Sequence, residues 1–186
     1  TSTGSRSISI GSNARTLAGA ATALGFDSTA QINAVALGGQ ANAGADGATA
    51  VGQGASGGGI RSFAGGQFSQ ALGLESVAIG GGTSFANTAT ANGERAVALG
   101  ANSDAVGNFT IAVGNGANAT EESALALGTS SAATRFYGIA IGQYTTAAGN
   151  SNVALGSRAT ATAFIGGTAL GAASQANQTG ATAVGT

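Results

Sequence analysis

Side chains that commonly serve as nucleophiles, general bases or metal ligands are scarce in this sequence, which contains no histidine and no cysteine. The usual pairs of a nucleophile and a base therefore cannot form. Glu121 and Glu122 are adjacent, so on a strand they point to opposite faces and cannot share a site. Asp27, Asp46 and Asp104 are isolated, whereas calcium-binding nonapeptide repeats need a regularly spaced aspartate. We expect no catalytic residue, no metal site and no cofactor, so the chain is predicted not to be an enzyme.

Binding of phosphate, nucleic acid or lipid also lacks the necessary residues. The run Gly57-Gly58-Gly59 resembles a phosphate-binding loop only in composition, because no lysine or helix follows it. The six basic residues are scattered arginines, and the net charge is −1, so no basic field attracts nucleic acid or an anionic membrane. No apolar run reaches the roughly 18 residues of a membrane helix. We expect no nucleic-acid partner and no membrane contact by this segment; any targeting or anchoring part lies outside it.

The dominant pattern is a repeat. An aliphatic–Ala–aliphatic–Gly tetrapeptide recurs along the chain, and nine of the twelve intervals between its closing glycines are 14 residues, the others being 13, 20 and 15. A disordered linker rich in Gly, Ala and Ser has no reason to keep such a register. The chain is therefore predicted to be a repeat protein. The closing glycines are Gly11, Gly25, Gly38, Gly52, Gly66, Gly80, Gly100, Gly114, Gly128, Gly142, Gly156, Gly171 and Gly185.

Each repeat contains the pattern of two short strands. Before the closing glycine, alanine alternates with aliphatic or β-branched residues, which is typical of a strand, and the glycine permits positive φ where the strand turns. Three residues later, small residues flank a polar one, as in Ala117-Asn118-Ala119, which predicts a strand with a tight inner face and a wet outer face. We expect a two-stranded β-solenoid whose strands pair in parallel between coils. The absence of proline fits continuous ladders.

The first strand of each repeat has two apolar faces, which predicts self-association. Our preferred phase places the alanines inside and the aliphatic residues outside; the reverse phase would leave an alanine stripe to be covered. Thirteen coils at about 4.8 Å give a rod of roughly 60 Å, and an aliphatic band along it would expose on the order of 600 Å². The expected packing residues are Val77, Ile79, Val97, Leu99, Ile111, Val113, Leu125, Leu127, Ile139, Ile141, Val153 and Leu155.

Three segments, SVAIGGGTSFA, IAVGNGANATEESALALG and IAIGQYTTAAGNSNVALG, resemble the head repeats of YadA-like trimeric autotransporter adhesins. The resemblance covers nearly the whole chain and implies one head domain over residues 1–186, folded as a left-handed parallel β-roll and assembled as a homotrimer. It further implies display at the outer membrane on a bacterial cell surface. The expected partner is a host matrix protein, with collagen or fibronectin as examples, a receptor or another surface.

Two other functions use similar repeats. A trimeric phage or virus fibre would have a structural role and would differ in its neighbouring domains. An ice-binding solenoid would need one flat threonine column, whereas the outward column of the second strand is mixed, with Arg15, Thr29, Asn42 and Gln70 among its members.

One coil contains six extra residues, which we place within residues 81–88, the segment GGTSFANT. They cannot join the strands without shifting later columns, so a loop at one corner is predicted. Phe85 is its only large side chain; it serves either as a ligand contact or as a plug against a neighbouring chain. The candidate ligand-binding residues are Thr83, Ser84, Phe85 and Asn87 in this segment, with Arg61 and Tyr137 elsewhere.

Overall fold

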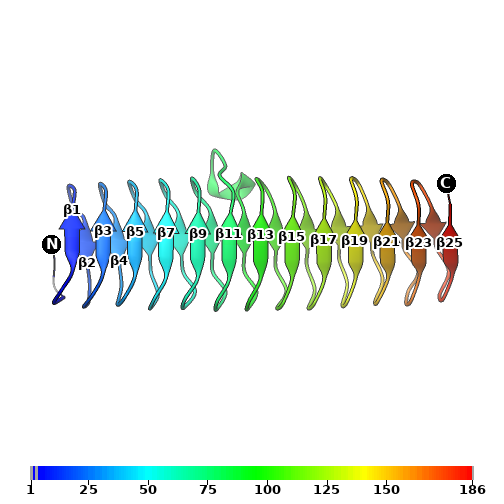
Figure 1. The fold of residues 1–186 in the computed structure, drawn as a ribbon, viewed down its shortest axis with the longest axis horizontal. Coiled ribbons are helices and arrows are strands. Elements are labelled where there is room, and N and C mark those ends of the chain that lie inside the picture. The colour runs from blue at the N-terminus through cyan, green and yellow to red at the C-terminus, as the bar shows by residue number, and fades with distance from the viewer. Residues whose placement is uncertain (1, 3, 186) are drawn as a thin grey trace.

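The protein is a rod of stacked coils in which two parallel sheets lie face to face (Figure 1). This computed structural model describes residue 2 and residues 4–185. The termini lie at opposite ends of the rod, and one loop stands out from it near the middle. The prediction of an all-β parallel solenoid with about thirteen coils of about 14 residues is confirmed.

The first sheet has thirteen strands of three residues, and the second has twelve strands of two residues. The first contains β1 (Ile8–Ile10), β3 (Thr22–Leu24), β5 (Val35–Leu37), β7 (Thr49–Val51), β9 (Phe63–Gly65), β11 (Val77–Ile79), β13 (Val97–Leu99), β15 (Ile111–Val113), β17 (Leu125–Leu127), β19 (Ile139–Ile141), β21 (Val153–Leu155), β23 (Thr168–Leu170) and β25 (Thr182–Val184). The second contains β2 (Arg15–Thr16), β4 (Thr29–Ala30), β6 (Asn42–Ala43), β8 (Ser56–Gly57), β10 (Gln70–Ala71), β12 (Thr90–Ala91), β14 (Asp104–Ala105), β16 (Asn118–Ala119), β18 (Ala132–Ala133), β20 (Thr146–Ala147), β22 (Thr160–Ala161) and β24 (Gln175–Ala176).

Every strand pairs with its equivalents in the neighbouring coils, so identical repeat positions stack into columns. Ala126, for example, pairs with Ala112 on one side and Ala140 on the other. This register gives the backbone N–H and C=O groups of each interior strand partners in the next coil. The 14-residue period therefore sets both the strand pairing and which side chains stack on one another.

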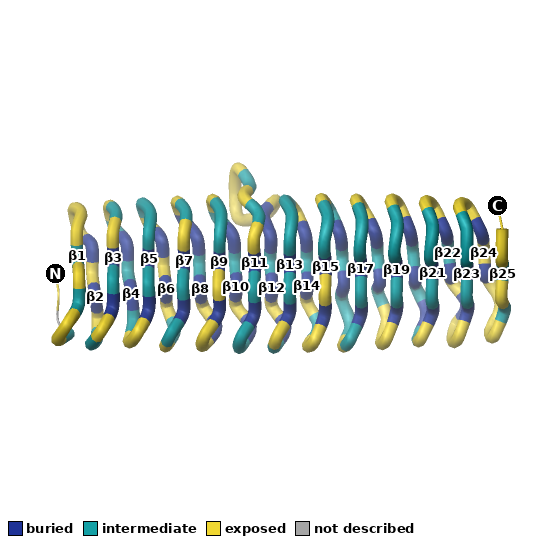
Figure 2. Tube along the Cα trace, viewed as in Figure 1, coloured by how far each residue is buried: buried dark blue, intermediate teal, exposed yellow. Residues whose placement is uncertain are grey.

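The core is built almost entirely from alanine. The inner alanines of both sheets are at most 1% exposed, except Ala183 in the terminal strand β25, whereas their aliphatic neighbours in the first sheet are half-buried or exposed (Figure 2). The preferred phase, with alanine inside, is therefore the observed one. Where serine replaces the inner alanine three residues after a closing glycine, its hydroxyl donates to the carbonyl of that glycine: Ser103 Oγ donates to Gly100 O at 2.7 Å. Such a bond satisfies a buried hydroxyl that would otherwise be costly.

Ala126→Leu is expected to destabilise the rod by about 1–3 kcal/mol, because the added carbons do not fit between two closely packed sheets. Ala126 is fully buried in β17, whereas the outward Asn118 of β16 offers a control in the same coil region. Asn118→Leu should leave the melting temperature nearly unchanged. Thermal unfolding followed by circular dichroism measures both variants, and equal shifts would contradict this assignment of the columns.

The corners of the coils depend on left-handed backbone conformations. Nineteen non-glycine residues in the described part have φ between 52° and 61°, and they stand at the turns. Among them are the large side chains of Phe68, Phe109, Tyr137 and Tyr144. The sequence analysis assigned positive φ only to the closing glycines, which have φ between 115° and 155°. A left-handed residue helps the chain turn at a corner, and these positions recur from coil to coil with different side chains.

Candidate functional site

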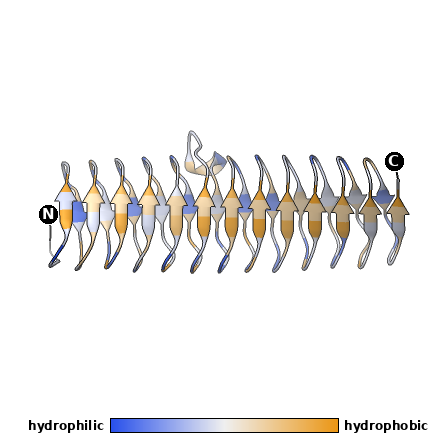
Figure 3. Ribbon diagram, viewed as in Figure 1, coloured by the Kyte–Doolittle hydropathy of each residue, from blue (hydrophilic) through white to orange (hydrophobic). Residues whose placement is uncertain are grey.

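An aliphatic band follows the outer face of the first sheet along the rod (Figure 3). The twelve predicted packing residues occupy the two outward columns of β11, β13, β15, β17, β19 and β21. Ile79 and Ile111 are 45% and 40% exposed, and most of the others are half-buried by their neighbours in the same column. We call these twelve residues the aliphatic stripe. Toward the ends of the rod, threonine interrupts these columns, at Thr22, Thr49 and Thr168.

The extra residues of the long coil form a compact loop between β11 and β12. The loop contains one 3-10 turn, η1 (Phe85–Asn87), and its N-cap is Ser84. The Asn87 side chain closes the loop, because its Oδ1 accepts from Ser84 N at 3.0 Å and its Nδ2 donates to Thr83 Oγ1 at 2.9 Å. Thr83, Ser84 and Asn87 thus organise the loop with the same polar groups that could contact a ligand.

The loop is also fixed to the coil that precedes it. The rings of Phe85 and Phe68 meet edge to face, with 4.9 Å between their centroids, and Gln70 Nε2 donates to Phe85 O at 3.0 Å. At the base, buried Thr88 donates through Oγ1 to Gly80 O at 2.8 Å. Phe85 remains 52% exposed. Its contact within this structure is with its own chain, and half of its surface is free for another molecule.

An open hollow of about 450 Å³ lies beside the loop. Amide and hydroxyl groups of Gln67, Thr83, Asn87, Asn102 and Asn115 line it, together with Gly81, Gly82 and Ala101. Two of the predicted residues, Thr83 and Asn87, therefore belong to a larger polar surface that includes the next two coils. The sequence analysis did not include Gln67, Asn102 or Asn115 among the candidate residues. All three lie one or two residues after a closing glycine, and this shared position could have placed them at the same corner as the loop.

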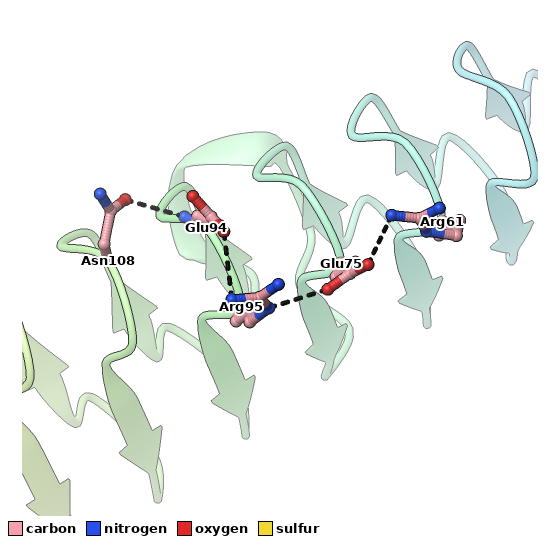
Figure 4. A network of polar contacts seen from close by, with 5 residues as sticks. All are labelled: Arg61, Glu75, Glu94, Arg95 and Asn108. Carbon is pink, nitrogen blue, oxygen red and sulfur yellow. Dashed lines mark hydrogen bonds and ion pairs between the residues drawn. The ribbon is translucent and has the colours of Figure 1, made fainter.

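Arg61 lies at the other corner, where the chain passes from the second sheet to the first. Its Nη2 pairs with Glu75 Oε1 at 2.6 Å, and Arg95 Nε pairs with Glu75 Oε2 at 2.8 Å (Figure 4). Hydrogen bonds from Arg95 and Arg61 hold the pKa of Glu75 below its ordinary value. The pairs therefore contribute stability above the ordinary glutamate pKa and lose it as pH falls through the lowered one. Exposed ion pairs of this kind contribute little to the free energy of unfolding.

The ion-pair ladder continues along the same corner beyond Arg95. Glu94 Oε1 lies 3.4 Å from Arg95 Nη1, and the Glu94 backbone N–H donates to Asn108 Oδ1 at 2.9 Å. The Arg95 guanidinium lies 5.8 Å from the centre of the Phe109 ring, within the range of a cation–π contact. Arg61 therefore takes part in an intramolecular ladder while its side chain stays 65% exposed, and its ligand contact remains a prediction.

Tyr137 stands at this same second corner, three coils after Arg95, and is 58% exposed. The loop instead connects the first sheet to the second, so it emerges from the first corner. The structure therefore brings together Thr83, Ser84, Phe85 and Asn87 and places Arg61 and Tyr137 apart from them. Within the described residues, no group of three or more Asp or Glu side chains gathers to hold a metal ion. No described helix has the length and hydropathy needed to span a membrane.

Comparison with known proteins assigns the family. A search among curated proteins finds no match. The sequence profile of the YadA head domain repeat, in contrast, matches seven segments that follow the coils and cover most of the chain: residues 2–28, 30–55, 58–83, 87–103, 105–131, 140–162 and 165–186. The loop tip falls between two matched segments. With its parallel two-sheet coils and alanine core, the chain belongs to the YadA head domain repeat family.

Proposed function

We propose that this chain is the head of a trimeric adhesin displayed at the outer membrane on a bacterial cell surface. The observation that carries the proposal is the aliphatic stripe, which runs along the outer face of a YadA-family rod. A soluble monomer rarely exposes a contiguous apolar patch of more than a few hundred Å². The role is adhesive and not enzymatic, and residues 1–186 act as one head domain.

In the proposed homotrimer, the three stripes face a common axis and cover one another. Burial of a Val, Leu or Ile side chain contributes about 1.5 kcal/mol or more, so twelve positions per chain supply ample driving force before ordering costs. The coils are left-handed in this assembly. Support comes from Figure 1, where the chain rises along the front sheet and returns along the back sheet while advancing from the N-terminus to the C-terminus.

The proposed ligand is a host matrix protein or receptor, for which collagen and fibronectin are suitable test surfaces. The loop would appear three times at one height of the trimer, and three weak contacts on one particle strengthen attachment through avidity. The loop is rigidly mounted on Gln67, Phe68 and Gln70 and presents half of the Phe85 ring. A rigid loop with an exposed aromatic side chain is a suitable contact for a protein surface.

A six-residue deletion tests the loop without disturbing the coil. Removing residues 83–88 leaves Gly81 and Gly82 as the two corner residues, and the second of these positions has φ near 60° in other coils, as at Phe68 and Tyr144. Glycine accepts that conformation freely. Deleting residues 82–87 would instead place the β-branched Thr88 there, which is strained. The first deletion is therefore the appropriate variant.

We expect the variant that lacks residues 83–88 to keep its oligomeric mass while adhesion of cells displaying it to collagen or fibronectin falls several-fold. Removing an equally exposed ring elsewhere, Phe26→Ala, is the matched control and should adhere like the native protein. Adhesion equal to that of the native protein would remove the loop from the proposed site. Failure of the native protein itself to adhere to matrix proteins, receptors or any other surface would contradict the adhesive function.

A further inference from the structure

The coil that closes at Gly171 is one residue longer than the regular coil, and a buried asparagine accommodates the difference. Asn152 is fully buried. Its Nδ2 donates to Ala161 O and to Ala163 O, both at 2.9 Å, and its Oδ1 accepts from Gly167 N at 2.8 Å. The Asn152 side chain thus bonds Ala163 O and Gly167 N at the widened turn, and it adds a second hydrogen bond to Ala161 O, which already accepts from Ala148 N. The turn is consequently a fixed structure, since a buried unpaired group would be costly.

This widened turn holds Phe164 away from the rod. Phe164 is 81% exposed, although phenylalanine normally buries most of its surface. The turn is tied to the preceding coil on both sides, because Asn150 N donates to Phe164 O at 3.2 Å and Gly166 N donates to Asn150 O at 3.0 Å. A fixed backbone that presents an exposed aromatic ring suits recognition of a ligand, because little entropy is lost when the ring is contacted.

Phe164 forms one wall of an open hollow of about 420 Å³, and Phe136 forms another. The two phenylalanines stand at the same corner two coils apart, so their backbones are separated by about 10 Å. Asn150 belongs to the coil between them, so the hollow has an aromatic side chain on either side of an amide. The remaining lining residues are Arg135, Ala148, Asn150 and Thr162. The volume lies within the range of small-molecule sites, about 300–1,000 Å³.

The polar groups of the hollow include unused donors. Among the described residues, the Arg135 guanidinium has no ion pair or hydrogen bond, even though Glu121 occupies the equivalent position one coil earlier. The Asn150 carboxamide likewise has no side-chain hydrogen bond within that part of the chain, whereas Thr162 Oγ1 donates to Asn177 Oδ1 at 2.9 Å. A planar guanidinium with free N–H groups matches a carboxylate in a bidentate arrangement.

The position of the hollow keeps it separate from the aliphatic stripe. Ala148 and Thr162 directly follow β20 and β22 of the second sheet, so the hollow opens on the second-sheet side of its corner. A trimer that buries the first sheet leaves it open to solvent. Residues 132–139 and 163–164 also fall outside the segments that match the YadA head domain repeat. Arg135, Phe136 and Phe164 are therefore side chains that the family repeat does not account for.

We propose that this hollow binds a carboxylate-bearing sugar residue of a glycan, a site beyond the adhesive function proposed above. The apolar C–H face of a pyranose ring packs on aromatic rings, which Phe136 and Phe164 provide. The carboxylate pairs with Arg135, and a hydroxyl group pairs with the Asn150 carboxamide, which can donate and accept. An extended peptide would need a longer groove, whereas the two phenylalanines limit this hollow to two coils. Sialic acid and glucuronic acid share the chemistry that the site requires.

Saturation-transfer NMR on the native 186-residue chain tests the proposal with three probes: sialyllactose, a hyaluronan disaccharide that contains glucuronic acid, and neutral lactose. We expect saturation of at least one acidic probe and binding of lactose that is about tenfold weaker, because lactose lacks the charge-assisted bond. The stronger of the two acidic probes identifies the source of the carboxylate. Saturation of neither acidic probe, or equal saturation of lactose, would overturn the proposal.

Variants separate this site from other aromatic and basic residues. Phe164→Ala and Arg135→Gln are each expected to weaken binding of the acidic probe about tenfold or more while the melting temperature stays unchanged, since both side chains are exposed. Phe26→Ala and Arg158→Gln are matched controls at the first corner and should bind normally. Unchanged binding in Phe164→Ala and Arg135→Gln would refute the assignment. A reduced oligomeric mass in Phe164→Ala would also refute it, because the ring would then be a contact between chains. Sugar binding and assembly are separate readouts, so either result leaves the other proposal intact.

Discussion

Gly128→Ala is expected to lower the stability of the rod by about 3–5 kcal/mol and the melting temperature by about 10 °C. Gly128 has φ of 127°, a conformation that alanine rarely adopts, and an added Cβ would lie 2.5 Å from Gly142 O in the next coil. The same close approach recurs from coil to coil, since the Cβ at Gly114 would lie 2.5 Å from Gly128 O. Neither backbone can move without shifting the stacked coils on either side.

Gly116→Ala is the matched control for this prediction. Gly116 lies nearby at the same corner, but its φ of 66° is the ordinary left-handed conformation, and an added Cβ would come no closer than 3.5 Å to Ser130 Oγ. The expected cost is about 1 kcal/mol. Thermal unfolding at a fixed protein concentration compares the two variants. Similar melting temperatures would show that the closing glycines are tolerant of side chains and that the coil stacking differs from the one described.

Leu127→Asp is expected to dissociate the proposed trimer. Leu127 belongs to the aliphatic stripe, where threefold symmetry brings three copies together, and three carboxylates would lose water and repel one another. The side chain is half-buried in the single chain, so each separate rod tolerates the charge better than the assembly does. Sedimentation velocity at micromolar concentration should show single chains where the native protein shows trimers.

Thr146→Asp places the same charge on the outer face of the second sheet and serves as the control for assembly. Thr146 is half-exposed in β20, and β20 belongs to the sheet that faces away from the stripe. This variant should sediment like the native protein. The stripe would be rejected as the interface by a Leu127→Asp protein that remains trimeric, and also by dissociation of both variants.

The repeat in the sequence predicts most of this fold. Its period indicates which residues of successive coils stack on one another, and the residue types at each position indicate which of them are buried. Twelve alanines and one serine at one position indicate a space that accepts nothing larger. Deciding which face of each strand points inward required one further argument, that polar residues such as Asn118 must face water. The burial of the alanines agrees with that argument. The pattern and this one argument sufficed because every coil repeats the same packing arrangement.

The corners were less predictable because their columns are chemically mixed. Left-handed φ occurs at Arg61, Glu75 and Phe109 without any glycine to mark it. Stacking at the repeat period could have paired Arg61 with Glu75, which are 14 residues apart, but the pairing of Glu75 with Arg95 crosses the loop at a separation of 20. The hydrogen bonds of Asn152 depend on one extra residue in the following coil, and no composition signal reveals how such a turn is closed.

For the loop, the sequence predicts the position in the chain but not the contacts. Its place in the chain follows from the register, since later columns return to phase after Gly100. Its attachment to Phe68 and Gln70 depends on the path of six residues through space, which the period does not specify. The candidate residues Arg61 and Tyr137 were likewise chosen as outward side chains, and only the two-corner geometry separates them from the loop.

The number of chains in the native rod tests the central claim most directly. Light scattering coupled to size-exclusion chromatography, at micromolar concentration of the 186-residue chain, measures this number without a ligand. The account predicts a mass three times that of the 17.3 kDa chain. A stable species with the mass of one chain would contradict it, because the aliphatic stripe would then remain exposed to water.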